Sequence, residues 1–264
     1  MGHNLLEGKV VVITGSTRGI GYGMAMCCAD EGAYVVASGR DEEMIRKVDE
    51  ELKPYNGMCI HADATSMDSL NNLMEKAYER YGKIDFVVAN AGITDVCLID
   101  DLDVARFEKM ININLEGEFK TIKAGLPYLR KNEPDGEIRG KIVCTGSDCS
   151  LAGWAHLTSY SAAKFAVRGM VQALARELGP EGITVNCIVP GIIETEMWKT
   201  HDKLACAIEG LEPGQAWQNE VAKIPLGRGG LPEDLGKGLV MLLSHYADYI
   251  TGCSLPVGGG SSIH

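Results

Sequence analysis

The sequence lacks the long apolar runs of a membrane protein, because no stretch approaches the roughly 18 residues that a spanning helix needs. It also lacks a basic excess, since 25 Lys and Arg stand against 36 Asp and Glu and the formal net charge is −11. A negative surface repels nucleic acid and anionic membranes, so we expect neither as a partner. An anionic ligand needs a locally basic pocket in such a chain.

Paired cysteines are missing too. The nine cysteines form no C-x-x-C pair and no zinc-ligand spacing, so we expect no metal site. The odd count, and the absence of an apolar targeting segment in the opening MGHNLLEGKV, favour a reducing cytoplasm over a disulfide-bonded secreted protein. Glycine, by contrast, is plentiful, with 32 residues, and in an α/β protein it usually serves tight turns and close backbone approaches.

Short β-branched runs alternate with helical patterns along the chain. Strands are predicted at 9–14, 33–39, 57–63, 84–92, 141–147, 183–191 and 254–257. Helical patterns lie between them, and the two longest are at 103–130 and 158–178. This repetition predicts an α/β fold with a single doubly wound parallel sheet of the Rossmann type and helices on both faces. We interpret 1–264 as one domain, with its ligand beyond the carboxyl ends of the strands.

The first predicted strand ends in TGSTRGIG, which places Gly15, Gly19 and Gly21 at a tight turn into a helix. Absent side chains let a pyrophosphate approach the backbone, and the free N–H groups of a helix N-terminus favour its charge. A tight turn without a ligand is the alternative. Polar residues at the later strand ends favour dinucleotide binding.

Four motifs occur in a specific order: TGSTRGIG at 14–21, ANAG at 89–92, YSAAK at 160–164 and PGIIET at 190–195. In order and spacing the chain resembles the short-chain dehydrogenase/reductase family over almost its whole length. The resemblance implies a nicotinamide cofactor and hydride transfer between a carbonyl and an alcohol. Within the family the chain is similar to acetoin, butanediol and polyol dehydrogenases and to 3-oxoacyl and hydroxysteroid reductases.

The resemblance also assigns cofactor contacts to the glycine turn and the strand ends. These residues are Gly15, Ser16, Thr17, Arg18, Gly19, Ile20, Gly21, Arg40, Asp63, Ala64, Asn90, Ala91, Gly92, Tyr160, Lys164, Pro190, Gly191, Ile193 and Thr195. Two of them have a structural alternative. Asp63 either contacts adenine or caps the next helix, and Thr195 either contacts the nicotinamide end or caps a helix.

The end of the second predicted strand indicates which dinucleotide binds. Gly39 stands where members of the family that prefer NAD carry an acid, and Arg40 follows it directly. With Arg18 in the glycine turn, two guanidinium groups can clamp a 2′-phosphate. NADP(H) is therefore favoured and NAD(H) is the alternative. The competing role for Arg40 is a surface ion pair with Asp41 or Glu43, which contributes little.

Tyr160 and Lys164 lie four residues apart and so share one face of a predicted helix. A nearby ammonium stabilises a phenolate and lowers the pKa of the phenol from about 10, which makes the tyrosine a usable acid or base. On these two residues alone, a half-buried tyrosine beside a solvated lysine is the simpler interpretation. Ser147 ends the fifth predicted strand, faces the same crevice and can hold the substrate oxygen.

The family resemblance implies that Asn114, Ser147, Tyr160 and Lys164 are the catalytic set, with Lys164 also binding the nicotinamide ribose. Ser150 and Thr145 compete with Ser147 for its role. Asn114 is expected to hold a water that links the lysine to solvent. The alternatives are the nearby Asn112, and a purely structural Asn114 that hydrogen-bonds helix backbone.

Substrate selection is assigned to the variable segment 192–228, which is expected to form an apolar lid. Its candidates are Met197, Trp198, Leu204 and Trp217, and local packing is preferred for Trp217. The expected substrate contacts are Ser147, Trp154, Tyr160, Met197 and Trp198. A sizeable apolar ketone suits this pocket, but the sequence does not decide between hydroxysteroid, acetoin or polyol, and 3-oxoacyl substrates.

The predicted function is an NADP(H)-dependent oxidoreductase that interconverts a small-molecule ketone and a secondary alcohol, with Tyr160 moving the proton. A non-catalytic NADP(H)-binding sensor on the same fold is the rival. A dehydratase or epimerase is a third interpretation. The Ser–Tyr–Lys set favours the enzyme. Apolar residues on more than one face of the 103–130 and 158–178 helices, together with the family resemblance, predict a homotetramer.

Overall fold

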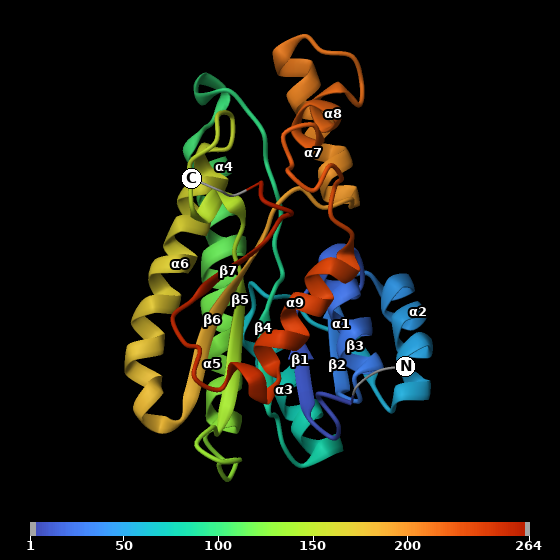
Figure 1. Cartoon of the computed structure of the whole chain (residues 1–264), viewed down its shortest axis with the longest axis vertical. Helices are drawn as coiled ribbons and strands as arrows, with labels where there is room; N and C mark the ends of the chain where they lie inside the picture. The colour runs from blue at the N-terminus through green and yellow to red at the C-terminus, as the bar shows by residue number, and fades with distance from the viewer. Residues whose placement is uncertain (1–3, 262–264) are drawn as a thin grey trace.

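A computed structural model describes residues 4–261 of the chain, and within them one parallel sheet has the strand order β3-β2-β1-β4-β5-β6-β7 (Figure 1). Its strands are β1 (Val10–Ile13), β2 (Tyr34–Gly39), β3 (Met58–His61), β4 (Phe86–Ala89), β5 (Gly140–Thr145), β6 (Ile183–Pro190) and β7 (Ser254–Val257). Each neighbouring pair is parallel. The predicted doubly wound fold is confirmed.

Helices cover both faces of this sheet. They are α1 (Gly19–Asp30), α2 (Glu42–Leu52), α3 (Met67–Tyr81), α4 (Val104–Ile111), α5 (Gly117–Leu129), α6 (Thr158–Leu178), α7 (Glu196–Glu209), α8 (Gln215–Val221) and α9 (Pro232–Leu243). Side chains of α3, α5 and α6 pack into the core on one face, and those of α1, α2 and α9 into the core on the other. Within the described part of the chain, no helix is long and apolar enough to cross a bilayer.

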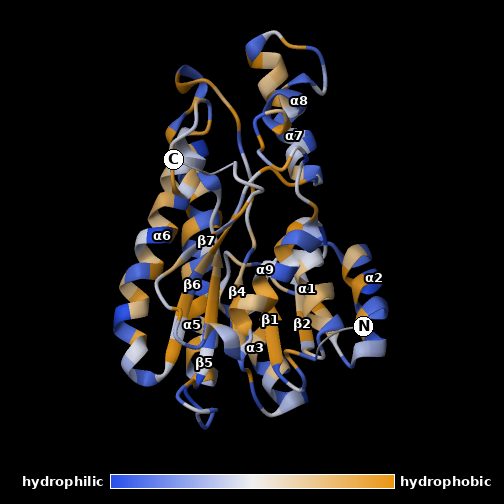
Figure 2. Cartoon of the chain, in the orientation of Figure 1, coloured by the Kyte–Doolittle hydropathy of each residue, from blue (hydrophilic) through white to orange (hydrophobic). Residues whose placement is uncertain are grey.

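The central strands β1, β4, β5 and β6 are buried along their whole length, and buried parallel strands are apolar without strict alternation. In β1, Val10 and Val12 enter one core, whereas Val11 and Ile13 enter the other. Figure 2 shows the consequence, with the most hydrophobic colouring on the central strands and hydrophilic colouring on the outer helices. Burial on both faces is what made these segments readable as strands from the sequence.

The sheet order reverses at β1, which lies between β2 and β4. From β1 the chain builds outward to β3, and then crosses back to β4 on the other side. In open α/β sheets the crevice at such a reversal, beyond the carboxyl ends of the strands, is the usual ligand site. Here α7 and α8 project beyond those ends, at the top of the view in Figure 1.

The helix predicted at 103–130 is not uniform. It consists of α4, a π-helical segment Asn112–Glu116, and α5. At its end the N–H of Gly117 donates to the carbonyl of Asn112, five residues earlier instead of four. Such a wide turn holds one more residue than an α-helical turn and often occurs at functional sites. Prediction of a single α-helix was therefore wrong in the middle of this segment.

Candidate active site

A cavity of about 840 Å³ lies at the carboxyl ends of the strands. Its wall combines the glycine turn, the ends of β2, β4, β5 and β6, the start of α6 and the start of α7. It includes Asn114, Ser147, Tyr160 and Lys164, and it includes every predicted cofactor residue except Ser16. Residues predicted from motifs far apart in the sequence are thus brought to one site.

Ser16 has a different place. Its side chain is fully buried, and its hydroxyl donates to the carbonyl of Ile13 at 2.7 Å. The same hydroxyl accepts from the N–H of Ser38 at 3.0 Å. Ser16 therefore ties the glycine turn to β2, and its side chain is not on the cavity wall.

Two glycines of the turn, Gly15 and Gly21, have no space for a side chain. Gly15 has φ +64°, and a Cβ there would lie 2.7 Å from Cα of Ala91. A Cβ on Gly21 would lie 2.3 Å from the carbonyl oxygen of Gly15. Asn90 fastens the turn to β4, because its Nδ2 donates to the carbonyls of Thr14 at 2.9 Å and Gly15 at 3.0 Å.

The first N–H groups of α1 follow this turn, and the N-cap residue Arg18 makes no side-chain cap. A helix start with uncapped N–H groups beside a glycine cradle is suited to a phosphate group. The residues present thus fit the pyrophosphate of a dinucleotide.

Arg40 lies at the end of β2, and its side chain is 60% exposed. Its Nη1 lies 4.0 Å from Oδ2 of Asp63, at the limit of an ion pair. The predicted alternative, a pair with Asp41 or Glu43, is wrong. Asp41 instead caps α2, accepting from the N–H groups of Glu43 and Met44.

The structural alternative for Asp63, a cap on the next helix, is wrong, because Ser66 caps α3. The Oδ1 atom of Asp63 accepts from the N–H of Thr65 at 2.9 Å and from its hydroxyl at 2.7 Å. The backbone hydrogen bond from Thr65, assisted by the charge of Arg40, lowers the pKa of Asp63. An ionised Asp63 therefore stands on the cavity wall beside Arg40.

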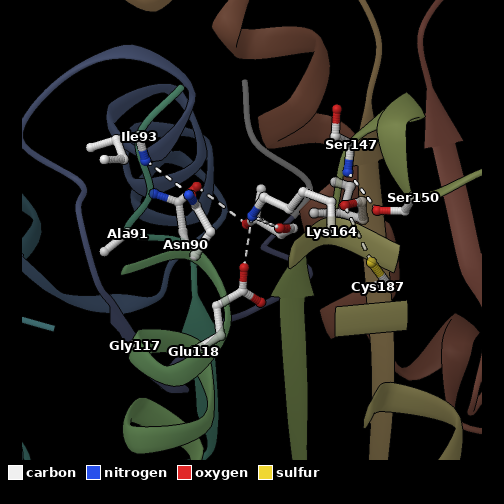
Figure 3. A network of polar contacts seen from close by, with 12 residues as sticks. Asn90, Ala91, Ile93, Gly117, Glu118, Ser147, Ser150, Lys164 and Cys187 are labelled. Carbon is white, nitrogen blue, oxygen red and sulfur yellow. Dashed lines mark hydrogen bonds and ion pairs between the residues drawn. The ribbon is translucent and has the colours of Figure 1, made fainter. Parts of the chain in front are cut away.

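Tyr160 and Lys164 both reach the cavity from the first turns of α6, and Nζ of Lys164 lies 5.9 Å from the centre of the Tyr160 ring. The lysine side chain is only 3% exposed, so the alternative of a solvated lysine is wrong. Its ammonium donates to the carbonyl of Thr145 at 2.6 Å and to Oε1 of Glu118 at 2.8 Å (Figure 3).

Burial raises the pKa of Tyr160 to about 12. The ammonium of Lys164 opposes this rise, and so does a hydrogen bond with the hydroxyl of Ser147. The lysine thus acts on the phenol in the expected direction, but within the protein its effect on the pKa is smaller than that of burial. At neutral pH the phenol carries its proton, which is the form that donates to a carbonyl.

Ser147 follows β5 and caps a short helical turn. Its Oγ donates to Oδ1 of Asp148 at 2.8 Å and accepts from the N–H of Cys149 at 3.2 Å. Of its rivals, Ser150 accepts from the N–H of Ser147 and is off the cavity wall. Thr145 is on the wall, but its hydroxyl donates to Oδ1 of Asn90 at 3.2 Å. Among the three candidates, Ser147 is the one that lowers the pKa of Tyr160.

Asn114 is completely buried in the π-helical segment. Its Oδ1 accepts from the N–H of Ile93 at 3.0 Å, and its Nδ2 donates to the carbonyl of Met110 at 3.1 Å. Both ends of the amide therefore bond backbone, as the structural alternative expected, while the residue also forms part of the cavity wall. Asn112 is off that wall and accepts from Nζ of Lys120. The water-holding role of Asn114 stays a prediction.

The wall beyond the serine carries Trp154, Met197 and Trp198. Trp217 is off the wall and packs edge-on against Trp198, with ring centres 5.4 Å apart, so the preferred packing role is confirmed. Leu204 also lies off the wall, in the apolar cluster that adjoins Trp154.

Thr195 caps α7, accepting from the N–H of Trp198 at 3.3 Å, and it lines the cavity as well. Both roles given to it in the sequence are therefore compatible.

Sequence reasoning missed two acidic side chains beside the catalytic residues. The carboxylate of Glu118 accepts a hydrogen bond from Lys164, and that of Asp148 accepts one from Ser147. Burial raises the pKa of Asp148, although hydrogen bonds from Ser147 and Cys149 oppose this. The available signals were an acid four residues after Asn114 in a helix that faces the core, and an acid directly after the serine.

Comparison with known proteins shows which family the chain resembles over its length. The model of the short chain dehydrogenase family matches residues 9–204. The chain is 34% identical over 257 residues to the 3-oxoacyl-(acyl-carrier-protein) reductase of Thermotoga maritima, covering 97% of this chain and 98% of that protein. It is 33% identical over 258 residues to a diacetyl reductase, (S)-acetoin forming, of Staphylococcus epidermidis, covering 96% and 98%.

Among solved structures, the 3-ketoacyl-(acyl-carrier-protein) reductase from Brucella melitensis complexed with NADH is similar. It aligns with a TM-score of 0.86 at 30% sequence identity, covering 98% of this chain and 100% of that chain.

Proposed function

Since this chain belongs to the short chain dehydrogenase family of oxidoreductases, we propose that it interconverts a ketone and a secondary alcohol with NADP(H). The observation that carries this proposal is the position of Ser147, Tyr160 and Lys164 on the wall of the cavity that also contains the glycine turn. A protein that only senses the dinucleotide needs the glycine turn, but it does not need a serine–tyrosine–lysine set on the same cavity wall.

In this proposal the cofactor and three side chains have separate roles. The nicotinamide, when bound, supplies or accepts the hydride. Tyr160 donates its phenol proton to the carbonyl oxygen in reduction and takes it back in oxidation. Ser147 holds that oxygen beside the phenol, and Lys164 stabilises the phenolate that forms. We propose that the ammonium also binds the ribose hydroxyls of the cofactor.

We propose NADP(H) as the preferred cofactor because of the end of β2. A Cβ on Gly39 would lie 2.6 Å from Oγ1 of Thr17, so an acidic side chain at 39 requires Thr17 to move. Arg40 is exposed and only loosely paired, and Arg18 lies across the turn on the same cavity wall. These two cations suit a 2′-phosphate better than free ribose hydroxyls.

Substitution Arg40→Ala tests the cofactor proposal. Loss of a charge-assisted hydrogen bond is expected to raise the KM for NADPH by about tenfold or more and the KM for NADH by less than about threefold. Steady-state kinetics with each cofactor measure the two values. Arg46→Ala, at an exposed arginine of α2 that is off the cavity wall, is the matched control. Equal effects on both cofactors would contradict the assignment.

The substrate end of the cavity is proposed to be Trp154, Met197 and Trp198, with segment 192–228 as its cover. A panel of acetoin, 3-oxoacyl thioesters, 3-ketosteroids and ketoses tests this, with NADPH oxidation followed in each case. Turnover of at least one ketone is expected. Tight NADPH binding without turnover of any panel member would favour the sensor instead.

Assembly and location are proposals of the same kind. Phe119 on α5 and Phe165 on α6 are 47% and 42% exposed, and apolar surface on these helices suits subunit contacts. We expect a homotetramer, so light scattering should give about four times the 28.4 kDa of one chain. A monomer at working concentration would contradict this. The nine free cysteines suit a reducing cytoplasm.

A further inference from the structure

A second charged side chain is buried behind the catalytic lysine. The carboxylate of Glu118, on α5, is 0% exposed, and its Oε1 lies 2.8 Å from Nζ of Lys164 (Figure 3). Its Oε2 is also buried and has no hydrogen-bond partner. A carboxylate placed in the core with one oxygen unpaired costs free energy, which its ion pair with Lys164 offsets in part.

The charge of Lys164 depends on this carboxylate. Burial by itself lowers the pKa of a lysine, by up to about 3–5 units when the amine is fully enclosed. In this protein burial is the largest single influence and lowers the pKa of Lys164, but Glu118, with smaller contributions from Tyr160 and Cys187, raises the pKa above the ordinary 10.5. The other hydrogen-bond acceptor of the ammonium, the Thr145 carbonyl, is neutral.

The other titratable groups that face the pair cannot replace Glu118. They are Cys144 on β5, Cys187 on β6, and Tyr160 on α6 itself. Burial raises the pKa of each of these groups, so all three are neutral at pH 7. Within residues 4–261, Glu118 is therefore the one anion that pairs with Lys164.

We propose that Glu118 is a positioning residue that keeps Lys164 protonated and fixed beside Tyr160. It acts on the reaction only through the lysine, and the proposal rests on the proposed function of the site. A lysine that lost its proton could no longer stabilise the phenolate formed during reduction. Glu118 thereby extends the pH range over which Tyr160 can give up its proton.

Glu118→Gln tests this through the pH profile of kcat with NADPH and the best ketone of the panel. Glutamine keeps the size of the side chain but removes its charge, so the pKa of Lys164 should fall. We expect E118Q to approach the rate of the unaltered protein near about pH 6 and to be about tenfold or more slower near about pH 9. A purely structural role would instead lower the rate by the same factor at every pH.

Two further variants test whether the lost charge of Glu118 causes the altered pH profile. Glu118→Asp retains a carboxylate and should restore most of the lost alkaline activity. Glu116→Gln removes an exposed acid that lies two residues before Glu118 and pairs with Lys120. This variant should leave the pH profile of kcat unchanged. A profile of unchanged shape in E118Q would overturn the proposal.

Thermal unfolding without substrate gives a readout that does not depend on activity. In E118Q the folded pKa of Lys164 lies below its unfolded value, so the unfolded state binds more protons and stability rises with pH between the two values. In the unaltered protein that pKa is raised, and the contribution of Lys164 stays constant from pH 7 to 9. The pKa of Glu118, which burial raises to about 7 against the pull of Lys164, makes that carboxyl titrate at the lower edge of this window, where its own contribution to stability falls as the pH rises.

The melting temperature of E118Q should therefore rise relative to the unaltered protein between about pH 7 and 9, and parallel curves would contradict the proposal. If E118Q cannot be purified, E118M is compared with the double variant E118M/K164M. Recovery of stability by the second substitution is expected, because it removes the lone buried charge; no recovery would count against the pairing. If no ketone of the panel is reduced, the proposed function is wrong. The comparison of melting temperatures would still test whether Glu118 pairs with Lys164.

Discussion

Tyr160→Phe is expected to lower kcat for ketone reduction by about 10²- to 10⁴-fold, the usual contribution of a positioned acid. The phenylalanine ring keeps the packing of α6, and the ion pair of Lys164 with Glu118 is untouched. Only the proton donor is lost. Steady-state kinetics on the best ketone measure the rate, and NADPH fluorescence should show cofactor binding changed by less than about threefold.

The matched control is Tyr246→Phe, which removes a hydroxyl from a side chain that is 71% exposed and off the cavity wall. It should leave both rate and binding unchanged. Full activity in the Tyr160 variant would show that another group supplies the proton. The proposed mechanism would then be wrong even though the fold and the cofactor cavity are correct.

The second large effect is expected from Gly15→Ala. The alanine must adopt φ +64°, which costs about 1–2 kcal/mol, and its Cβ would lie 2.7 Å from Cα of Ala91. The backbone of Ala91 cannot move aside as a flexible side chain can. The clash should therefore add about 1–3 kcal/mol to the loss of stability. Each kcal/mol lowers the melting temperature of a chain of this size by about 2–4 °C. A displaced turn should also weaken NADPH binding by about tenfold or more.

Gly136→Ala separates the two causes of this loss. Gly136 has nearly the same φ, +63°, but a Cβ there meets nothing within 4 Å. It should therefore show the backbone strain alone and leave NADPH binding unchanged. Calorimetry and fluorescence on both variants measure the difference. Equal destabilisation would mean that the close approach of the turn to β4 is not what requires glycine.

The sheet could be predicted because its central strands are buried on both faces. Runs such as Val10–Ile13 contain only apolar residues, and no helical period competes with them. The helix predicted at 158–178 has the same limits in the structure. Because parallel strands end at one edge, residues placed at strand ends, such as Ser147 and Asn90, could be expected to meet.

Other features depend on three-dimensional packing, and the sequence could not supply them. Which acid pairs with Arg40 depends on the approach of β3 to β2, which brings Asp63 closer than Asp41. Whether Glu118 faces the core depends on how the preceding helix winds. A regular helix was assumed there, and the π-helical turn alters the direction of every later side chain.

That turn also bears on how the length of this chain can vary. A π-helical turn is the mark of one extra residue inserted into a helix, because the widened turn absorbs the addition. Elsewhere in the helix, an insertion would rotate all later residues by about 100° and carry Glu118 away from Lys164. Deletion of one residue between Asn112 and Glu116 would instead restore regular winding and leave α5 facing as it does now. The segment is therefore a place where a change in residue number is compatible with an unchanged orientation of α5.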